Sequence, residues 1–224
     1  MGLSIHYSGQ ITDKSKLSQL IEEVEEIATV HGWKYHIYER NFPKIDVNTD
    51  TIYDGKLYGI DVSPKGSEPI SFCFLSNGRM SSIMQLACWG KYDNEAQFEI
   101  QTDTQDEDGQ WKSKNETLTI TKEVAVSYLY KCSSKTQFAG AAIHEMIIGL
   151  IRYVSKEYLS DFELTDESLF WETSDRVLLE ANFQKNSRLL SAFGSALSQT
   201  QRLPNESVEE CLKRILKDFR SKKD

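Results

Sequence analysis

The sequence predicts a single α+β domain over residues 1–224, with a mixed, mostly antiparallel sheet framed by two β-α-β units, helices on one face and a C-terminal helical pair. Apolar residues alternate with polar ones in short segments, as in half-buried strands, and repeat at helical spacing in longer segments. The alternating segments gather in the middle of the chain. A chain of this length buries about 70% of the surface that its unfolded form exposes, so its core needs no disulfides.

The first β-α-β unit is predicted over residues 1–40. Residues 3–8 alternate as a strand does, and the segment WKYHIYE alternates again after the helix. Between them, residues 14–31 carry one apolar stripe at helical spacing, with Asp13 as the N-cap and Gly32 as the stop. A right-handed crossover through this helix would place the two strands parallel and close together in one sheet.

An antiparallel meander is predicted over residues 51–121. The segments LYGIDV and ISFCFL read as strands, and Asn77-Gly78 then gives a strong hairpin signal because both residues tolerate positive φ. The segments AQFEIQT and ETLTITKE form a further pair of strands around an acidic loop. We assign no element to residues 86–94.

The second β-α-β unit, residues 124–166, leaves one alternative open. Residues 124–132 are β-branched and aromatic, which favours a strand, but they can also extend the helix predicted over residues 134–159. The segment DFELT then forms the closing strand. Because the helices of the two units each carry one apolar stripe, we expect both to pack on the same face of one sheet.

Two helices close the chain, over residues 174–199 and 205–220, because the Leu203-Pro204 step breaks the helical pattern. The last helix has an apolar stripe that is too large to leave in water. We therefore expect it to dock on the body or on a second copy, which makes a protein partner or a homodimer possible through this helix. The stripe consists of Val208, Cys211, Leu212, Ile215, Leu216 and Phe219.

Composition narrows the classes of function. The chain has 26 basic and 34 acidic residues, and this net charge of −8 argues against nucleic acid as a partner. Four widely spaced cysteines without a C-x-x-C pair, and a polar N-terminal segment in place of a signal peptide, predict a cytoplasmic protein with free thiols. No apolar run reaches the roughly 20 residues of a membrane span, so no membrane association is expected. Without a glycine-rich phosphate loop, no cofactor is expected.

The pair His144-Glu145 matches the start of a zinc-hydrolase helix. Such a helix places a second histidine four residues after the first, but Ile148 occupies that position. We interpret His144 as a histidine at the boundary of the helix face, beside a solvated Glu145. The predicted core stripe is Ile143, Met146, Ile147, Leu150, Val154 and Tyr158.

The acidic segment 161–175 is the first candidate site. Its carboxylates surround Phe170 and Trp171, and clustered carboxylates can hold a divalent cation or act as an acid and base pair. In the alternative interpretation, Trp171 fills the core, while Ser174 and Asp175 cap the following helix, where the helix dipole favours negative charge.

The second candidate site contains His6 and His36. Alternation puts both side chains on the polar face of the predicted sheet, near Glu163 of the strand DFELT. Two imidazoles and a carboxylate can bind a transition metal or perform acid and base chemistry near neutral pH. Alternatively, each histidine bonds to a neighbour or to water on an open sheet face.

The absence of any catalytic signature favours a non-enzymatic cytosolic binding or regulatory module. A metal-dependent or acid/base hydrolase that uses residues 161–175 or the histidines is the alternative. Neither a catalytic residue nor a firm metal ligand is assigned. The candidate ligand-binding residues are His6, His36, Glu163, Trp171 and Glu172.

Overall fold

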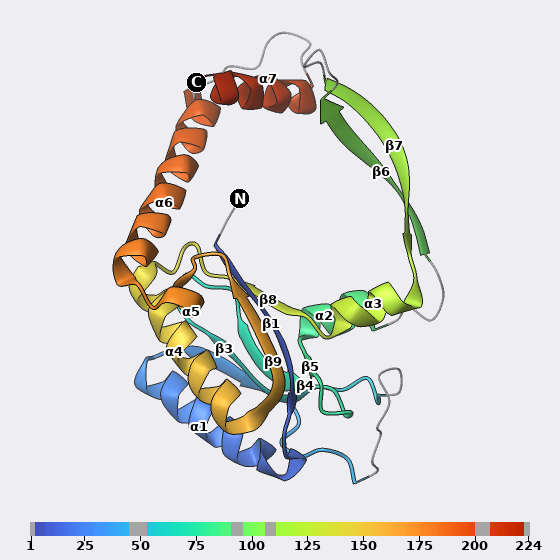
Figure 1. The fold of residues 1–224 in the computed structure, drawn as a ribbon, viewed down its shortest axis with the longest axis vertical. Helices are drawn as coiled ribbons and strands as arrows, with labels where there is room; N and C mark the ends of the chain where they lie inside the picture. The colour runs from blue at the N-terminus through green and yellow to red at the C-terminus, as the bar shows by residue number, and fades with distance from the viewer. Residues whose placement is uncertain (1–2, 45–52, 91–95, 106–110, 200–206, 222–224) are drawn as a thin grey trace.

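The computed structural model describes residues 3–44, 53–90, 96–105, 111–199 and 207–221, and its α+β class is the predicted one (Figure 1). The strands are β1 (Ser4–Ile11), β2 (Lys34–Ile37), β3 (Tyr58–Ser63), β4 (Ile70–Phe74), β5 (Met80–Ser81), β6 (Ala96–Gln105), β7 (Trp111–Ile120), β8 (Cys132–Lys135) and β9 (Leu159–Asp166). The helices are α1 (Leu17–Val30), α2 (Ile83–Trp89), α3 (Lys122–Leu129), α4 (Ala141–Tyr158), α5 (Phe170–Thr173), α6 (Arg176–Gln199) and α7 (Val208–Ser221).

The strands form two sheets and a separate hairpin. One sheet has the order β8-β1-β9, the other has the order β2-β3-β4-β5, and β6 pairs with β7. The ladders between these strands are antiparallel, as the sequence predicted for most of them. The predicted hairpin at Asn77-Gly78 joins β4 to β5, and Gly78 provides the positive φ of its turn.

The first predicted unit has the expected order of elements but not the expected pairing. Ile5 of β1 lies opposite Ser134 of β8 on one side and Asp166 of β9 on the other, so both edges of β1 are occupied. The strand β2 pairs instead with β3, where Tyr35 lies opposite Val62. The prediction of parallel, adjacent strands β1 and β2 is therefore wrong. So is the prediction that both helices cover one sheet, because α1 packs on β3 and α4 packs on β9.

The second unit is a true β-α-β unit with a shifted start. Both β8 and β9 run antiparallel to β1, so they run parallel to each other, and α4 connects them. Most of residues 124–132 belong to α3, which is separate from α4, and β8 begins only at Cys132. The hydroxyl of Thr121 accepts a hydrogen bond from the Val124 N–H and caps α3, while Ala125 and Leu129 are buried one helical turn apart. A cap and a helical burial pattern thus override the strand preference of these residues.

Both sheets share one apolar core with α1 and α4. The Tyr7 hydroxyl of β1 accepts a hydrogen bond from Ser71 N of β4 at 2.7 Å and donates one to Ser71 O at 3.1 Å, which ties the two sheets together. The two helices meet where the Glu23 carboxylate accepts hydrogen bonds from the hydroxyls of Tyr158 and Tyr153, at 2.6 and 2.7 Å. These bonds lower the pKa of Glu23, so the carboxylate remains an acceptor as the medium is acidified.

Two elements extend away from this body: the β6–β7 hairpin, with α2 and α3 at its base, and the long helix α6 (Figure 1). The first half of α6 packs on the body, since Leu179 is 1% exposed and Phe183 8%. The second half does not, since Leu190 is 37% exposed and Leu197 38%. The helix α7 packs on α6 at the end far from the body and buries Ile215, so the C-terminal helical pair forms as predicted. The expected docking of this helix on the body is not seen, because α6 holds it away from the sheets. We call residues 187–199 together with α7 the arm.

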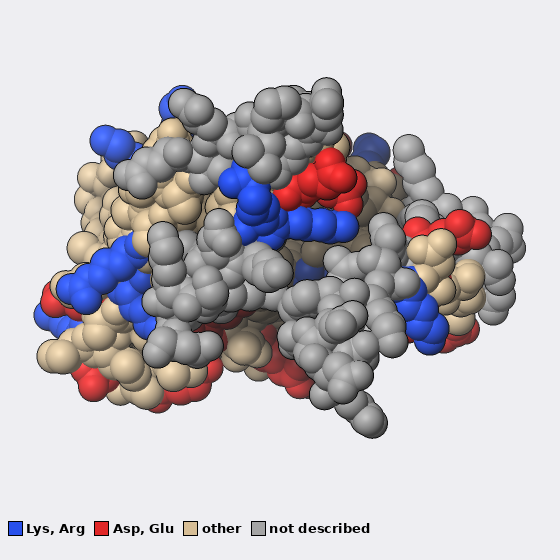
Figure 2. All heavy atoms as spheres, turned by 90° about the horizontal axis from the view of Figure 1, so that it is seen from above, with Lys and Arg blue, Asp and Glu red and all other residues tan. Residues whose placement is uncertain are grey.

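Charged side chains of both signs lie on the face of the molecule that carries α7. Seen from the α7 side, basic and acidic side chains are interspersed, and neither sign forms a continuous field over this face (Figure 2). Within the described ranges, no helix combines the length and the apolar character that crossing a membrane requires.

Candidate functional site

His144 lies inside the core and not at its boundary, which corrects the prediction from the sequence. The side chain is fully buried, and so are those of Ile147, Ile148 and Ile151 on the same face of α4. Ile143 is only partly buried. Four residues of the predicted stripe, Ile147, Leu150, Val154 and Tyr158, are buried as expected. The stripe is wider than predicted on the side of His144, because His144, Ile148 and Ile151 lie next to it at the helical repeat.

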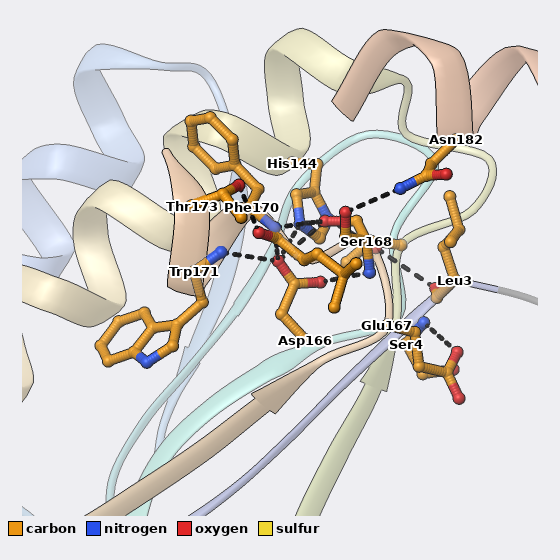
Figure 3. Close-up of polar contacts among 12 residues, drawn as sticks. Leu3, Ser4, His144, Asp166, Glu167, Ser168, Phe170, Trp171, Thr173 and Asn182 are labelled. Carbon is orange, nitrogen blue, oxygen red and sulfur yellow. Dashed lines mark hydrogen bonds and ion pairs between the residues drawn. The ribbon is translucent and has the colours of Figure 1, made fainter. Parts of the chain in front are cut away.

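Three hydroxyl and carboxyl groups surround the imidazole of His144 (Figure 3). Its Nε2 lies 3.1 Å from Asp166 Oδ2 and 2.9 Å from Ser168 Oγ, and its Nδ1 lies 2.8 Å from Thr136 Oγ1. Asp166 ends β9, Ser168 follows in the turn before α5, and Thr136 follows β8. The second β-α-β unit therefore brings all four side chains to one point under α4, and each of these residues is buried.

Asp166 is the centre of this network. Its Oδ2 accepts hydrogen bonds from Ser168 Oγ at 2.7 Å and from the backbone N–H groups of Phe170 and Trp171 at 3.0 Å each. Its Oδ1 accepts one from Ser168 N at 2.9 Å. Burial raises the pKa of Asp166, but the bonds from His144 and Ser168 outweigh burial, so this pKa lies below its ordinary value. Asp166 thus holds the 166–171 turn as a buried carboxylate.

The network contains Ser, His and Asp but lacks the geometry of a hydrolase triad. In a triad, the serine and the aspartate bond to opposite nitrogens of the imidazole. Here both Ser168 and Asp166 contact Nε2 of His144, Ser168 donates to Asp166, and Thr136 occupies Nδ1. Since Ser168 is also fully buried, it has no path to a substrate in this conformation. The arrangement is that of a structural polar network.

The histidines predicted to share a site lie in different sheets. His6 is on β1, and its Nε2 is 3.6 Å from Glu167 Oε1. His36 is on β2 and packs edge-on against Tyr38, with ring centroids 4.5 Å apart. Glu163 of β9 lies opposite Ser8, so it shares the face of β1 that carries His6. The structure therefore places His6 beside Glu167 and on the same sheet face as Glu163. His36 lies in the other sheet, so it does not share a site with them.

The acidic segment is organised by local contacts of the kind that the alternative interpretation described. Trp171 packs edge-on against Phe162 and lies beside the guanidinium of Arg152, which donates to Trp171 O at 2.6 Å. Asp175 caps α6, because its Oδ1 accepts from the N–H groups of residues 177 and 178. Glu172 is exposed on α5. In the described part of the chain, no three His, Cys, Asp or Glu side chains group as metal ligands would.

A concavity of about 480 Å³ lies between the N-terminus of α4 and the body half of α6. Phe183 forms part of its wall, and the same ring packs edge-on against His144 with centroids 5.4 Å apart. The concavity is thus next to the buried network, separated from it by Phe183. No motif in the sequence indicated it, because residues near position 140 meet residues near position 183 only through the packing of α4 on α6.

Comparison with known proteins finds no match to this chain among protein-family models, curated proteins or solved structures.

Proposed function

We propose that this chain is a non-enzymatic binding module that holds a protein partner on its arm. The buried network supports the non-enzymatic part of the proposal. Its carboxylate and imidazole already have hydrogen-bond partners inside the protein, and Phe183 covers the imidazole. A catalytic group must instead come within hydrogen-bond reach of a substrate.

The proposed partner surface is based mainly on the difference in exposure between the two halves of α6. Leu179 and Phe183 are buried in the body, whereas Leu190 and Leu197, seven residues apart and on one face of the helix, remain more than a third exposed. Leu212 of α7 adds a further exposed apolar side chain to the arm. Exposed apolar side chains on an element that projects from the body are found at sites where another protein binds, since their burial there is favourable.

Site-specific photo-crosslinking tests this proposal in the full chain. A photoreactive phenylalanine analogue at Leu190 or Leu197 is expected to capture one protein partner in cells of the source organism. The same analogue at Val30, an 81% exposed apolar residue of α1, serves as the matched control.

The captured protein must then bind the purified chain. We expect the double variant Leu190→Glu, Leu197→Glu to weaken this binding at least tenfold and Val30→Glu to leave it unchanged. Equal capture at Val30, or binding that survives the double variant, would contradict the proposed surface. Capture of the chain itself would identify the partner as a second copy.

A further inference from the structure

The β6–β7 hairpin projects from the body, and both of its faces are exposed around the middle of β7 (Figure 1). Lys114 and Glu116 lie on one face and Asn115 and Thr117 on the other, and all four residues are exposed. An isolated hairpin of two strands is at best marginally stable in water, whereas a sheet with more strands gains stability from each further ladder. Additional pairing along an edge of this hairpin is therefore favourable.

The outer edge of β7 offers a row of backbone groups for such pairing. Its ladder with β6 continues without a bulge along the whole strand, and within the described ranges β7 pairs with no other strand. The Thr102 hydroxyl donates to the carbonyl of the facing Lys114 at 3.2 Å, so this carbonyl points toward β6. Because backbone groups alternate in direction along an antiparallel strand, those of residues 113, 115 and 117 point to the outer edge. A long, straight edge of this kind is a template for another strand.

The charges along β7 favour a second copy of the same strand as the partner at this edge. Two copies related by a two-fold axis at Asn115 run antiparallel, and Lys114 of each copy then lies opposite Glu116 of the other. Opposite charges at facing positions of a sheet are favourable, and like charges are unfavourable. Within one chain, Lys114 Nζ already lies 3.3 Å from Glu116 Oε1. The four charges of the two copies therefore alternate in sign around a square.

Other two-fold registers of β7 lack this match. An axis at Lys114 or at Glu116 places two like charges directly opposite each other. An axis at residue 113 or 117 moves Lys114 out of line with Glu116 of the other copy. The register at Asn115 also aligns the outward backbone groups of residues 113 and 117, and it covers nearly the whole length of β7.

The edge of β6 does not fit a second copy in this way. The charged residues of β6, Glu99 and Asp103, are both acidic, so two copies of this strand would bring only negative charges together. Pairing of β6 with β7 of another copy would leave an open edge at each end and would build an open chain of molecules. Charge and closure together therefore favour the edge of β7.

We propose that the chain forms a dimer through β7, in which the two hairpins make one four-stranded antiparallel sheet with its two-fold axis at Asn115. The outward backbone groups of residues 113, 115 and 117 form the hydrogen bonds between the copies. Lys114 and Glu116 set the register, since exposed ion pairs contribute more to specificity than to affinity. The hairpin is separate from the arm, so this proposal does not depend on the proposed partner surface.

Sedimentation equilibrium of the full chain at low ionic strength tests the dimer, because exposed charges are then least screened. The wild type is expected to form a reversible dimer and no larger species. Lys114→Glu and Glu116→Lys each place like charges opposite each other, so each variant alone is expected to dimerise at least tenfold more weakly. An equimolar mixture of the two variants restores opposite charges across the interface, and so does the double variant Lys114→Glu, Glu116→Lys. Both are expected to recover the dimer.

The double variant Leu190→Glu, Leu197→Glu is the matched control, because it changes the arm and leaves β7 intact. It is expected to dimerise as the wild type does. Three results would each overturn the proposal: a wild type that stays monomeric at millimolar concentration, loss of the dimer in the arm variant, or growth into larger oligomers. Failure of the mixture to recover the dimer would also overturn it, since Lys114 would then not face Glu116 of the other copy.

Discussion

The arm and the buried network under α4 differ in which side chains they expose to water. The network takes polar groups out of water and gives each of them partners, whereas the arm leaves apolar groups in water. Burying a charged group is tolerable only when hydrogen bonds replace its hydration, and Asp166 has such bonds on both oxygens. Leu190 and Leu197 keep 37% and 38% of their surface exposed, so the fold leaves part of their possible apolar burial unused. The comparison teaches that the network contributes to the stability of the body, whereas the exposed leucines of the arm contribute little to it, and we propose that they serve an interaction.

The largest effect is expected from Asp166→Ala. This change leaves His144, Ser168 and the N–H groups of the 166–171 turn without their shared acceptor. Removing one partner of a buried ionic network costs about 3–5 kcal/mol, and we expect a loss of this order in the free energy of unfolding. Denaturant titration measures it, with Asp175→Ala, which removes only an exposed helix cap, as the control. A loss below about 1 kcal/mol would contradict the central role of Asp166.

Acidification should remove part of the same stabilisation. The folded pKa of Asp166 lies below its ordinary value, so its contribution is fully present above the unfolded pKa of about 3.9 and is lost as the pH falls through the folded pKa. The difference in unfolding free energy between wild type and Asp166→Asn should therefore be constant near neutral pH and decrease below about pH 4. Urea titrations of both proteins from pH 7 to pH 3 measure it. A difference that grows on acidification would reverse the assigned sign.

A smaller effect is expected from Ser168→Ala. The hydroxyl donates to Asp166 and contacts His144, but Asp166 keeps its backbone donors without it. We expect a loss of about 1–2 kcal/mol, as for one buried hydrogen bond. Thr136→Val tests the opposite side of the imidazole in the same way. If either change abolished folding, the network would be less redundant than its geometry indicates.

The smallest effect on stability is expected from the arm. Leu197→Glu places a charge where the leucine is already partly solvated, so the free energy of unfolding should change by no more than about 0.5 kcal/mol. Leu179→Glu, on the buried half of the same helix, is the matched control and should destabilise strongly. Equal effects of the two substitutions would show that the two halves of α6 are not different environments.

Local signals in the sequence predicted much of this fold. The cap Asp175 was identifiable because a cap acts on neighbours in the chain, and the helical pair at the C-terminus followed from periodicity. Asp13 also caps by accepting from Ser15 N, but it caps the 3-10 turn Lys14–Lys16 that precedes α1 and not α1 itself. The network was not predictable in this way. His144 meets Asp166 and Ser168 across 22 and 24 residues, and a polar residue is normally assigned outside the apolar stripe. The pairing of β1 with β8 could not be predicted from the sequence either, since β8 lies more than a hundred residues later in the chain.

Hydrogen exchange along α6 is the most direct test of the central claim, because one helix spans both regions. The amides of residues near Leu179 and Phe183 should be protected nearly as well as those of α4, since they open only when the body unfolds. The amides between Leu190 and Leu197 should exchange at least ~100-fold faster in the purified chain, because local opening there exposes little buried surface. Uniform protection along the whole of α6 would contradict the account, since the arm would then be part of the stable body.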